Sequence, residues 1–178
     1  KWNNKFLFQG GGGLNGVVSP AIGKIPSHGS TAKPALSRGY AVVTTDSGHS
    51  GGSRDISFTE DQLARLNYAY ASTGKVTNIA KQIIENVYSV YPKYSYFMGC
   101  SNGGREAMQA AMRYPNEFDG IVAGNPGFRL SRAAIGEAWD NQQFTKYAPA
   151  NDKREKIVSQ ALTQKDLDAV VKGILKRC

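Results

Sequence analysis

The stretch that decides the fold runs from Tyr94 to Gly104 and reads YSYFMGCSNGG. Its first half is a short run of aromatic and apolar residues, of the length of a buried strand. Glycines then flank a serine, and a helical pattern rich in alanine and methionine follows until Tyr114, where Pro115 ends it. The stretch therefore predicts a strand that turns sharply into a helix.

Three further segments are typical of buried strands, namely residues 6–8, 40–45 and 118–123. Between the strand at residues 40–45 and the strand that begins at Tyr94, apolar residues recur at helical spacing over residues 78–91, and Pro92 ends the pattern. Strands that alternate with helices are typical of a mostly parallel sheet joined by right-handed crossovers. We predict an α/β fold in which helices cover both faces of this sheet.

The character of the chain changes after Pro126. Helical patterns cover about residues 131–144 and 163–176, and no further convincing strand follows. We therefore divide the chain into residues 1–130, the N-terminal part of a catalytic domain, and residues 131–178, a helical segment.

Composition excludes two classes of protein. The 178 residues carry a formal charge of +8, but the lysines and arginines are scattered and form no nucleic-acid-binding motif. No apolar run approaches the ~18 residues of a membrane-spanning helix. We expect a globular chain that binds neither nucleic acid nor membrane.

The pattern from Gly99 to Gly103 fits the G-x-S-x-G nucleophile elbow of the α/β-hydrolase fold, and it lies in the strand-turn-helix context that this motif requires. Ser101 is the predicted nucleophile. The backbone N–H of Asn102 is then placed to bind a developing oxyanion at the positive end of the helix. The alternative is a glycine-rich strand-to-helix turn with an incidental serine, as occurs in nucleotide-binding folds. The phosphate-binding version of this turn has little support, since no G-x-G-x-x-G and no Walker lysine follows a strand.

A second oxyanion donor is expected from a loop after an earlier strand. The glycine run from Gly10 to Gly13 follows the strand at residues 6–8 and occupies this place. We expect the donor within Gly11 to Gly13, with Gly12 and Gly13 favoured. A flexible turn without a catalytic role is the alternative.

The general base of the reaction is not evident. Only His28 and His49 are present, and both precede Ser101, whereas α/β-hydrolases place the serine, the acid and the histidine in that order. We interpret His49 as a structural loop residue near a strand end and His28 as a surface residue. The acid and the base are expected downstream of Cys178 or on a second chain.

Together these motifs resemble the tannase and feruloyl esterase family, which includes hydrolases of terephthalate monoesters. The resemblance spans nearly the whole chain, and the Cys100-Ser101 pair is its most specific part. The similar stretches are residues 2–6, 10–13, 45–49, 99–105 and 118–124.

The resemblance implies that Cys100 forms a disulfide with a cysteine that follows the catalytic histidine. It also implies a large lid insertion, often with a calcium site, that begins near Cys178; this segment itself has no expected cofactor or metal. Cys100 ends a central strand and Cys178 ends a helix, so their Cα atoms should lie beyond the ~7 Å that a disulfide tolerates. We expect each to pair outside this sequence, in a secreted or periplasmic protein.

The expected function is that of a serine esterase that cleaves esters of aromatic acids, such as feruloyl, galloyl or terephthalate esters. The aromatic acid follows from the resemblance alone. Two alternatives remain open: an acyltransferase or peptidase on the same fold, and a catalytically inactive binding or assembly chain.

Overall fold

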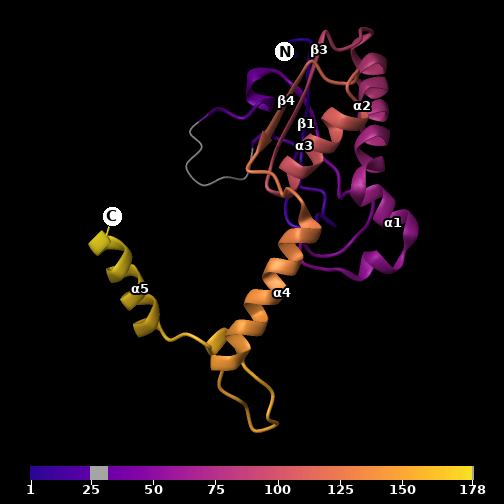
Figure 1. Cartoon of the computed structure of the whole chain (residues 1–178). Coiled ribbons are helices and arrows are strands. Elements are labelled where there is room, and N and C mark those ends of the chain that lie inside the picture. The colour runs from indigo at the N-terminus through magenta and orange to yellow at the C-terminus, as the bar shows by residue number, and fades with distance from the viewer. Residues whose placement is uncertain (25–31, 178) are drawn as a thin grey trace. The chain divides into compact units, whose positions relative to one another are not determined.

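The computed structural model describes residues 1–24 and 32–177 (Figure 1). His28 and Cys178 therefore lie outside the described residues. The chain divides into two compact units, Lys1–Gly127 and Phe128–Cys178. The sequence places its boundary at residue 130, close to this division.

The first unit contains a four-stranded parallel sheet with the strand order β2-β1-β3-β4. Its strands are β1 (Lys5–Gln9), β2 (Ala41–Val43), β3 (Tyr94–Cys100) and β4 (Gly120–Gly124). All three pairings are parallel, with Phe8 opposite both Val43 and Phe97. The four predicted strands are present, although β2 is shorter than predicted.

The core lies on one face of this sheet. Side chains alternate between the faces of a strand, and Phe6, Phe8 and Phe97 all point to the same side and are fully buried. The rings of Phe8 and Phe97 stack with centroids 4.7 Å apart, and Phe118 meets Phe97 edge-on at 5.5 Å. Helices α2 (Ser72–Tyr88) and α3 (Asn102–Arg113) add Ile84 and small alanines to this core.

The helical region before β3 is longer than predicted. It starts with the 3-10 helix η2 (Ser57–Glu60) and α1 (Gln62–Leu66), continues through a π-helical turn, η3 (Asn67–Ala71), and enters α2 at Ser72. Asp61 caps α1, since its side chain accepts a hydrogen bond from the Ala64 N–H at 2.6 Å.

The apolar stripe that predicts the helix over residues 78–91 lies on α2 but is mostly exposed. Ile84 is buried, but Ile79, Ile83 and Val87 are more than half exposed. The helix buries small and polar residues instead, and Gly74 lets the helix approach the ring of Tyr114. Periodicity identifies a stripe, but it does not identify the surface that covers the stripe.

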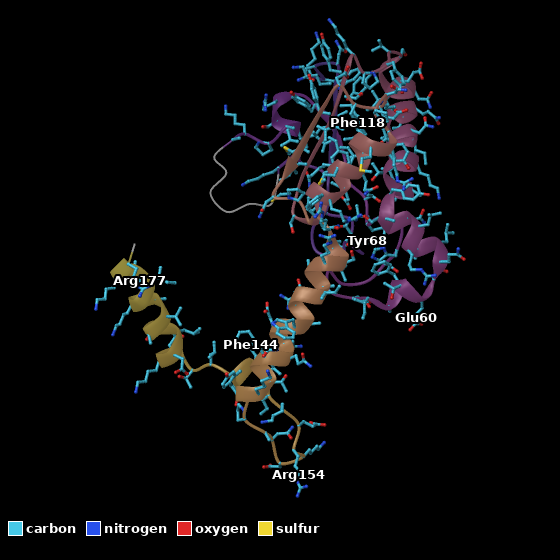
Figure 2. The ribbon with its side chains drawn as sticks, in the orientation of Figure 1. Glu60, Tyr68, Phe118, Phe144, Arg154 and Arg177 are labelled. Carbon is cyan, nitrogen blue, oxygen red and sulfur yellow. The ribbon has the colours of Figure 1, made fainter. Side chains whose placement is uncertain are left out.

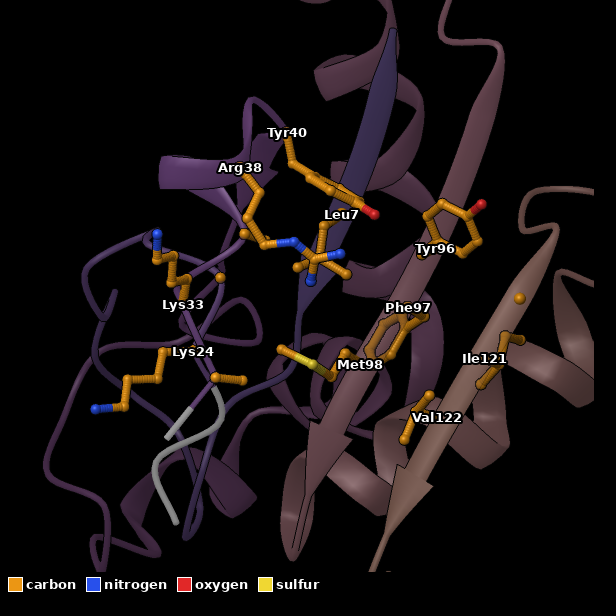
Figure 3. A pocket seen from close by; sticks show the side chains of 14 residues that line it. Leu7, Lys24, Lys33, Arg38, Tyr40, Tyr96, Phe97, Met98, Ile121 and Val122 are labelled. Atoms are coloured by element: carbon orange, nitrogen blue, oxygen red, sulfur yellow. The ribbon is translucent and has the colours of Figure 1, made fainter. Parts of the chain in front are cut away.

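Helices α2 and α3 both pack on the face of the sheet that carries this core. On the opposite face the described residues line a partly open pocket of about 500 Å³. Figure 3 shows Leu7, Tyr96 and Met98 along the strands, with Tyr40 and Arg38 beside them. Neither Ser101 nor the glycine run lines this pocket. The loop that carries the 3-10 helix η1 (Leu36–Arg38) lines part of this pocket.

The second unit consists of α4 (Leu130–Tyr147), the 3-10 helix η4 (Val158–Gln160) and α5 (Gln164–Arg177). Neither α4 nor α5 has a buried residue, and Figure 2 shows their side chains, including Phe144 and Arg177. Over residues 128–177 the only β-pairing is an isolated bridge between Ala150 and Lys156. Across the described residues of both units, no helix has the length and apolar character needed to cross a membrane.

Candidate active site

Ser101 occupies a strained position between β3 and α3. Its φ of 58° and ψ of −120° lie outside the regions that residues with a side chain normally adopt. Its N–H donates to the Gly124 carbonyl at 3.1 Å, and its own carbonyl accepts from the N–H groups of Gly127 and Arg105, each at 3.0 Å. Such strain costs about 1–3 kcal/mol and persists only where the surroundings hold it in place.

Glycines allow the backbone to pack closely around this turn. A Cβ added to Gly99 would collide with the carbonyl group of Gly103, and one added to Gly104 would lie 2.5 Å from the Gly124 oxygen. A Cβ on Gly103 would lie 2.6 Å from the Gly11 oxygen. The G-x-S-x-G-G sequence is therefore required by the close packing of three backbone segments, which also brings the glycine loop against the start of α3.

The side chain of Ser101 is exposed, and its Oγ forms no hydrogen bond with a described residue. The N–H of Asn102 belongs to the first turn of α3, where backbone donors have no partner inside the helix. An unpaired N–H beside a serine at the positive end of a helix is suited to bind a negatively charged oxygen.

The glycine loop differs in its hydrogen bonding from residue to residue. Gly11 donates its N–H to Oε2 of Glu106 at 2.9 Å, so this group is not free for a ligand. No described residue accepts a hydrogen bond from the N–H of Gly12 or Gly13, and both glycines are exposed. Of the three predicted candidates, Gly12 and Gly13 are therefore the ones with an available donor.

Glu106 is the main residue that the sequence analysis missed. Its carboxyl group is buried and accepts hydrogen bonds from Asn15 Nδ2 at 2.7 Å and Ser47 Oγ at 2.8 Å, in addition to Gly11. Asn102 joins the same cluster by donating from Nδ2 to Asn15 Oδ1 at 2.9 Å. These polar residues, which include Asn15 and Ser47, are at least nine-tenths buried.

A sequence signal for Glu106 existed. It lies among Gly103, Ala107 and Ala110, which share one face of α3 and are all buried. A carboxylate on an otherwise small and apolar helix face is rarely buried unless it is paired. The position could have been identified as special, although its partners could not.

A second cluster holds the side chain of Asn102 from the other side. Its Oδ1 accepts from Tyr68 Oη at 3.0 Å and from Arg105 Nε at 2.6 Å. The Arg105 guanidinium also donates to the carbonyls of Tyr68 and Ala69, at 3.0 and 3.1 Å, which belong to the π-helical turn. Burial raises the pKa of Tyr68 above its ordinary value, and the positive charge of Arg105 opposes that shift.

His49 lies in an aromatic environment. Its ring stacks on Phe58 at 3.9 Å and meets Tyr68 edge-on at 5.9 Å. Both ring nitrogens are shielded from solvent and have no hydrogen-bond partner among the described residues. Among the described residues, no hydrogen bond joins His49 to Ser101.

The described residues also contain no group of three or more His, Cys, Asp or Glu side chains that could hold a metal ion. Cys100 is partly buried and forms no disulfide with a described residue. The expected partners of Cys100 and Cys178 stay a prediction.

The sequence model of the family described as "Tannase and feruloyl esterase" matches residues 1–178. The chain belongs to this family. It is 37% identical over 186 residues to the mono(2-hydroxyethyl) terephthalate hydrolase of Piscinibacter sakaiensis, with coverage of 100% of this chain and 30% of that protein. It is 30% identical over 181 residues to a probable feruloyl esterase B-2 of Aspergillus flavus, covering 98% and 33% of the two chains.

Solved structures of the family show the same fold. Feruloyl esterase B from Aspergillus oryzae superposes with a TM-score of 0.66 at 28% identity, over 84% of this chain and 27% of that one. A tannin acyl hydrolase from Aspergillus niger gives a TM-score of 0.58 at 28% identity, with coverage of 84% and 27%. The predicted fold class and family are confirmed, and the chain spans about a third of the length of its curated relatives.

Proposed function

We propose that this chain carries the nucleophile of a serine-dependent carboxylic ester hydrolase. The observation that carries the proposal is the conformation of Ser101, whose strained backbone places an exposed hydroxyl beside the free N–H of Asn102. The relatives named above as a terephthalate monoester hydrolase and a feruloyl esterase are ester hydrolases, which supports this reaction class.

In the proposed mechanism, Ser101 Oγ attacks the ester carbonyl carbon while a histidine from another part of the protein takes the hydroxyl proton. The carbonyl oxygen becomes negatively charged and is bound by the N–H of Asn102 and by Gly12 or Gly13. The alcohol then leaves with a proton from the histidine and the acyl group stays on Ser101. Water, activated by the same histidine, releases the acid and restores the serine.

The proposed substrate is a small ester with an aromatic acid part. The support is the family and the names of its members, because no described pocket that adjoins Ser101 selects an acid. The acid and histidine of the triad, a lid and any structural calcium are proposed to come from other segments or from a second chain. The proposed compartment is extracellular or periplasmic.

The experiment is Ser101→Ala in the whole protein. Ser37→Ala is the control, because Ser37 is exposed on η1 and its hydroxyl donates to the Pro34 carbonyl at 2.7 Å. Hydrolysis of a chromogenic aryl ester should fall by several orders of magnitude, as when the serine of another hydrolase was removed (on the order of 10⁶). Rapid quenching should reveal an acyl adduct on the Ser101 peptide of the wild type. Wild-type activity in Ser101→Ala would eliminate the proposed mechanism.

A panel of aryl and alkyl esters, assayed in water and with added alcohols, tests the substrate and the reaction type. Faster cleavage of hydroxycinnamoyl, galloyl or terephthaloyl esters supports the aromatic acid. A preference for short aliphatic esters contradicts it, and efficient transfer to alcohols would indicate an acyltransferase instead.

A further inference from the structure

The buried carboxyl group of Glu106 has an unusual set of partners. Only 3% of the residue is exposed, and no lysine or arginine in the described part of the chain forms an ion pair with it. Its two oxygens instead face the Gly11 N–H, the Asn15 amide, the Ser47 hydroxyl and, at 3.5 Å, the Asn102 amide. Four donors match the acceptor capacity of an ionised carboxylate, which explains how a charge is tolerated there.

These donors come from distant parts of the sequence. Gly11 and Asn15 belong to the loop after β1, Ser47 to the loop after β2, and Asn102 to the first turn of α3. The hydrogen bond between Gly11 and Glu106 joins residues 95 positions apart. The carboxyl ends of parallel strands meet at one edge of a sheet, and Glu106 links three of the segments that gather there.

The two oxyanion donors of the proposed mechanism lie on two of these segments. The N–H of Asn102 moves with α3, whereas that of Gly12 or Gly13 moves with the glycine loop. Glu106 lies one turn after Asn102 on the same helix. Its carboxyl group accepts a hydrogen bond from the N–H of Gly11, the residue directly before Gly12. The Gly12 carbonyl accepts a hydrogen bond from the Asn15 N–H at 2.9 Å, and Asn15 Nδ2 donates to Glu106 at 2.7 Å. Glu106 therefore holds the loop on both sides of the Gly12 N–H.

We propose that Glu106 is a positioning residue that sets the distance between the glycine-loop donor and the Asn102 donor of the oxyanion hole. This inference rests on the proposed function. A negative charge close to a developing oxyanion opposes it electrostatically, so the contribution of Glu106 is geometric and outweighs that opposition.

A carboxylate suits this role better than an amide. A glutamine has one acceptor oxygen, so it can accept from Gly11 or from the Asn15 and Ser47 pair, but not from both. Its NH₂ group would face one of these donors. The loop and the helix would therefore lose one of their two connections while the side chain keeps its size.

The test compares Glu106→Gln with wild type in the whole protein, using the same chromogenic ester. Because a displacement of about 1 Å at a reacting centre can cost about 10²-fold, we expect kcat to fall about 10- to 100-fold while KM changes little. Affinity for a boronic acid, which mimics the tetrahedral intermediate, should fall by the same factor as kcat/KM. Affinity for the free product acid should stay as in wild type.

The control is Glu117→Gln in the turn between α3 and β4, where Glu117 pairs with the buried Lys81 at 2.8 Å. This variant should melt at a lower temperature but keep kcat, KM and boronate affinity. If Glu106→Gln does not fold, Glu106→Asp replaces it, since the shorter side chain keeps its charge but cannot span both sets of donors. Its kcat and boronate affinity should fall in the same way.

A folded Glu106 variant with wild-type kcat, or one whose boronate and product affinities fall together, overturns the inference. The proposed function would stand in that case, provided Ser101→Ala is inactive. Activity in Ser101→Ala would instead remove the proposed function itself.

Discussion

Two adjacent glycines of the loop after β1 should respond differently to the same small change. At Gly13 the backbone φ is +56°, and an added Cβ would lie 2.6 Å from the Ser53 carbonyl oxygen. The left-handed conformation costs about 1–2 kcal/mol for a residue with a side chain, and the steric overlap typically costs about 1–3 kcal/mol more. Gly13→Ala should therefore lower the free energy of unfolding by about 2–5 kcal/mol.

Gly12 has neither constraint. Its φ is not positive, and an added Cβ would meet nothing within 4 Å. Gly12→Ala should leave stability unchanged or raise it by up to about 1 kcal/mol, since alanine restricts the unfolded chain. Urea unfolding followed by circular dichroism measures both variants. Equal midpoints for Gly12→Ala and Gly13→Ala would refute the conformational reasoning.

The rate provides a second measurement on the same loop. Gly12→Val keeps the fold but places a branched side chain where the ester carbonyl must approach an N–H donor. The kcat should fall toward the ~10²- to 10³-fold loss seen when an oxyanion donor is removed, and KM should change less. A stable Gly12→Val enzyme with normal kcat would mean that the donor lies elsewhere.

Two further predictions concern titration and covalent bonds. Burial raises the pKa of Tyr68 above its value in the unfolded chain, so its contribution to stability is present below about pH 10 and is lost as the pH rises through the folded-state pKa. Tyr68→Phe should make the alkaline loss of stability shallower in urea unfolding between about pH 9 and pH 11, and an unchanged slope would contradict this. Non-reducing peptide mapping of the whole protein should find Cys100 and Cys178 in separate disulfides; a peptide that links the two, or a free Cys100 thiol in active enzyme, would show that this pairing is wrong.

The sequence predicts the fold well because its main signals are local. The run before Gly99 and the helix after Ser101 are contiguous, so the strand-turn-helix unit follows from residues that are neighbours in the chain. The start of α2 could not be predicted, because the segment from Gln62 to Ala71 combines a short α-helix with a π-helical turn. The carbonyls of Tyr68 and Ala69 in this segment accept hydrogen bonds from Arg105, which lies more than thirty positions away.

The site is predicted only in part, because some of its interactions join residues that are far apart in the sequence. Ser101 and Asn102 follow from the motif, and the glycine loop follows from its place after a strand. The carboxylate cluster depends on hydrogen bonds between loops that meet only in the folded protein, so no spacing rule connects Glu106 with Gly11. The exposure of the apolar stripe on α2 likewise depends on the tertiary structure and does not follow from the spacing of its residues.

The order of the strands has a practical consequence for handling the protein. In the described sheet β2 and β4 are the outermost strands, and β4 carries the exposed apolar side chain of Val122. An uncovered outer strand offers its backbone N–H and C=O groups to any other extended chain and promotes aggregation. Residues 1–127 expressed by themselves should therefore form oligomers as their concentration rises, and poor solubility of that piece would reflect open strand edges and not a defective core.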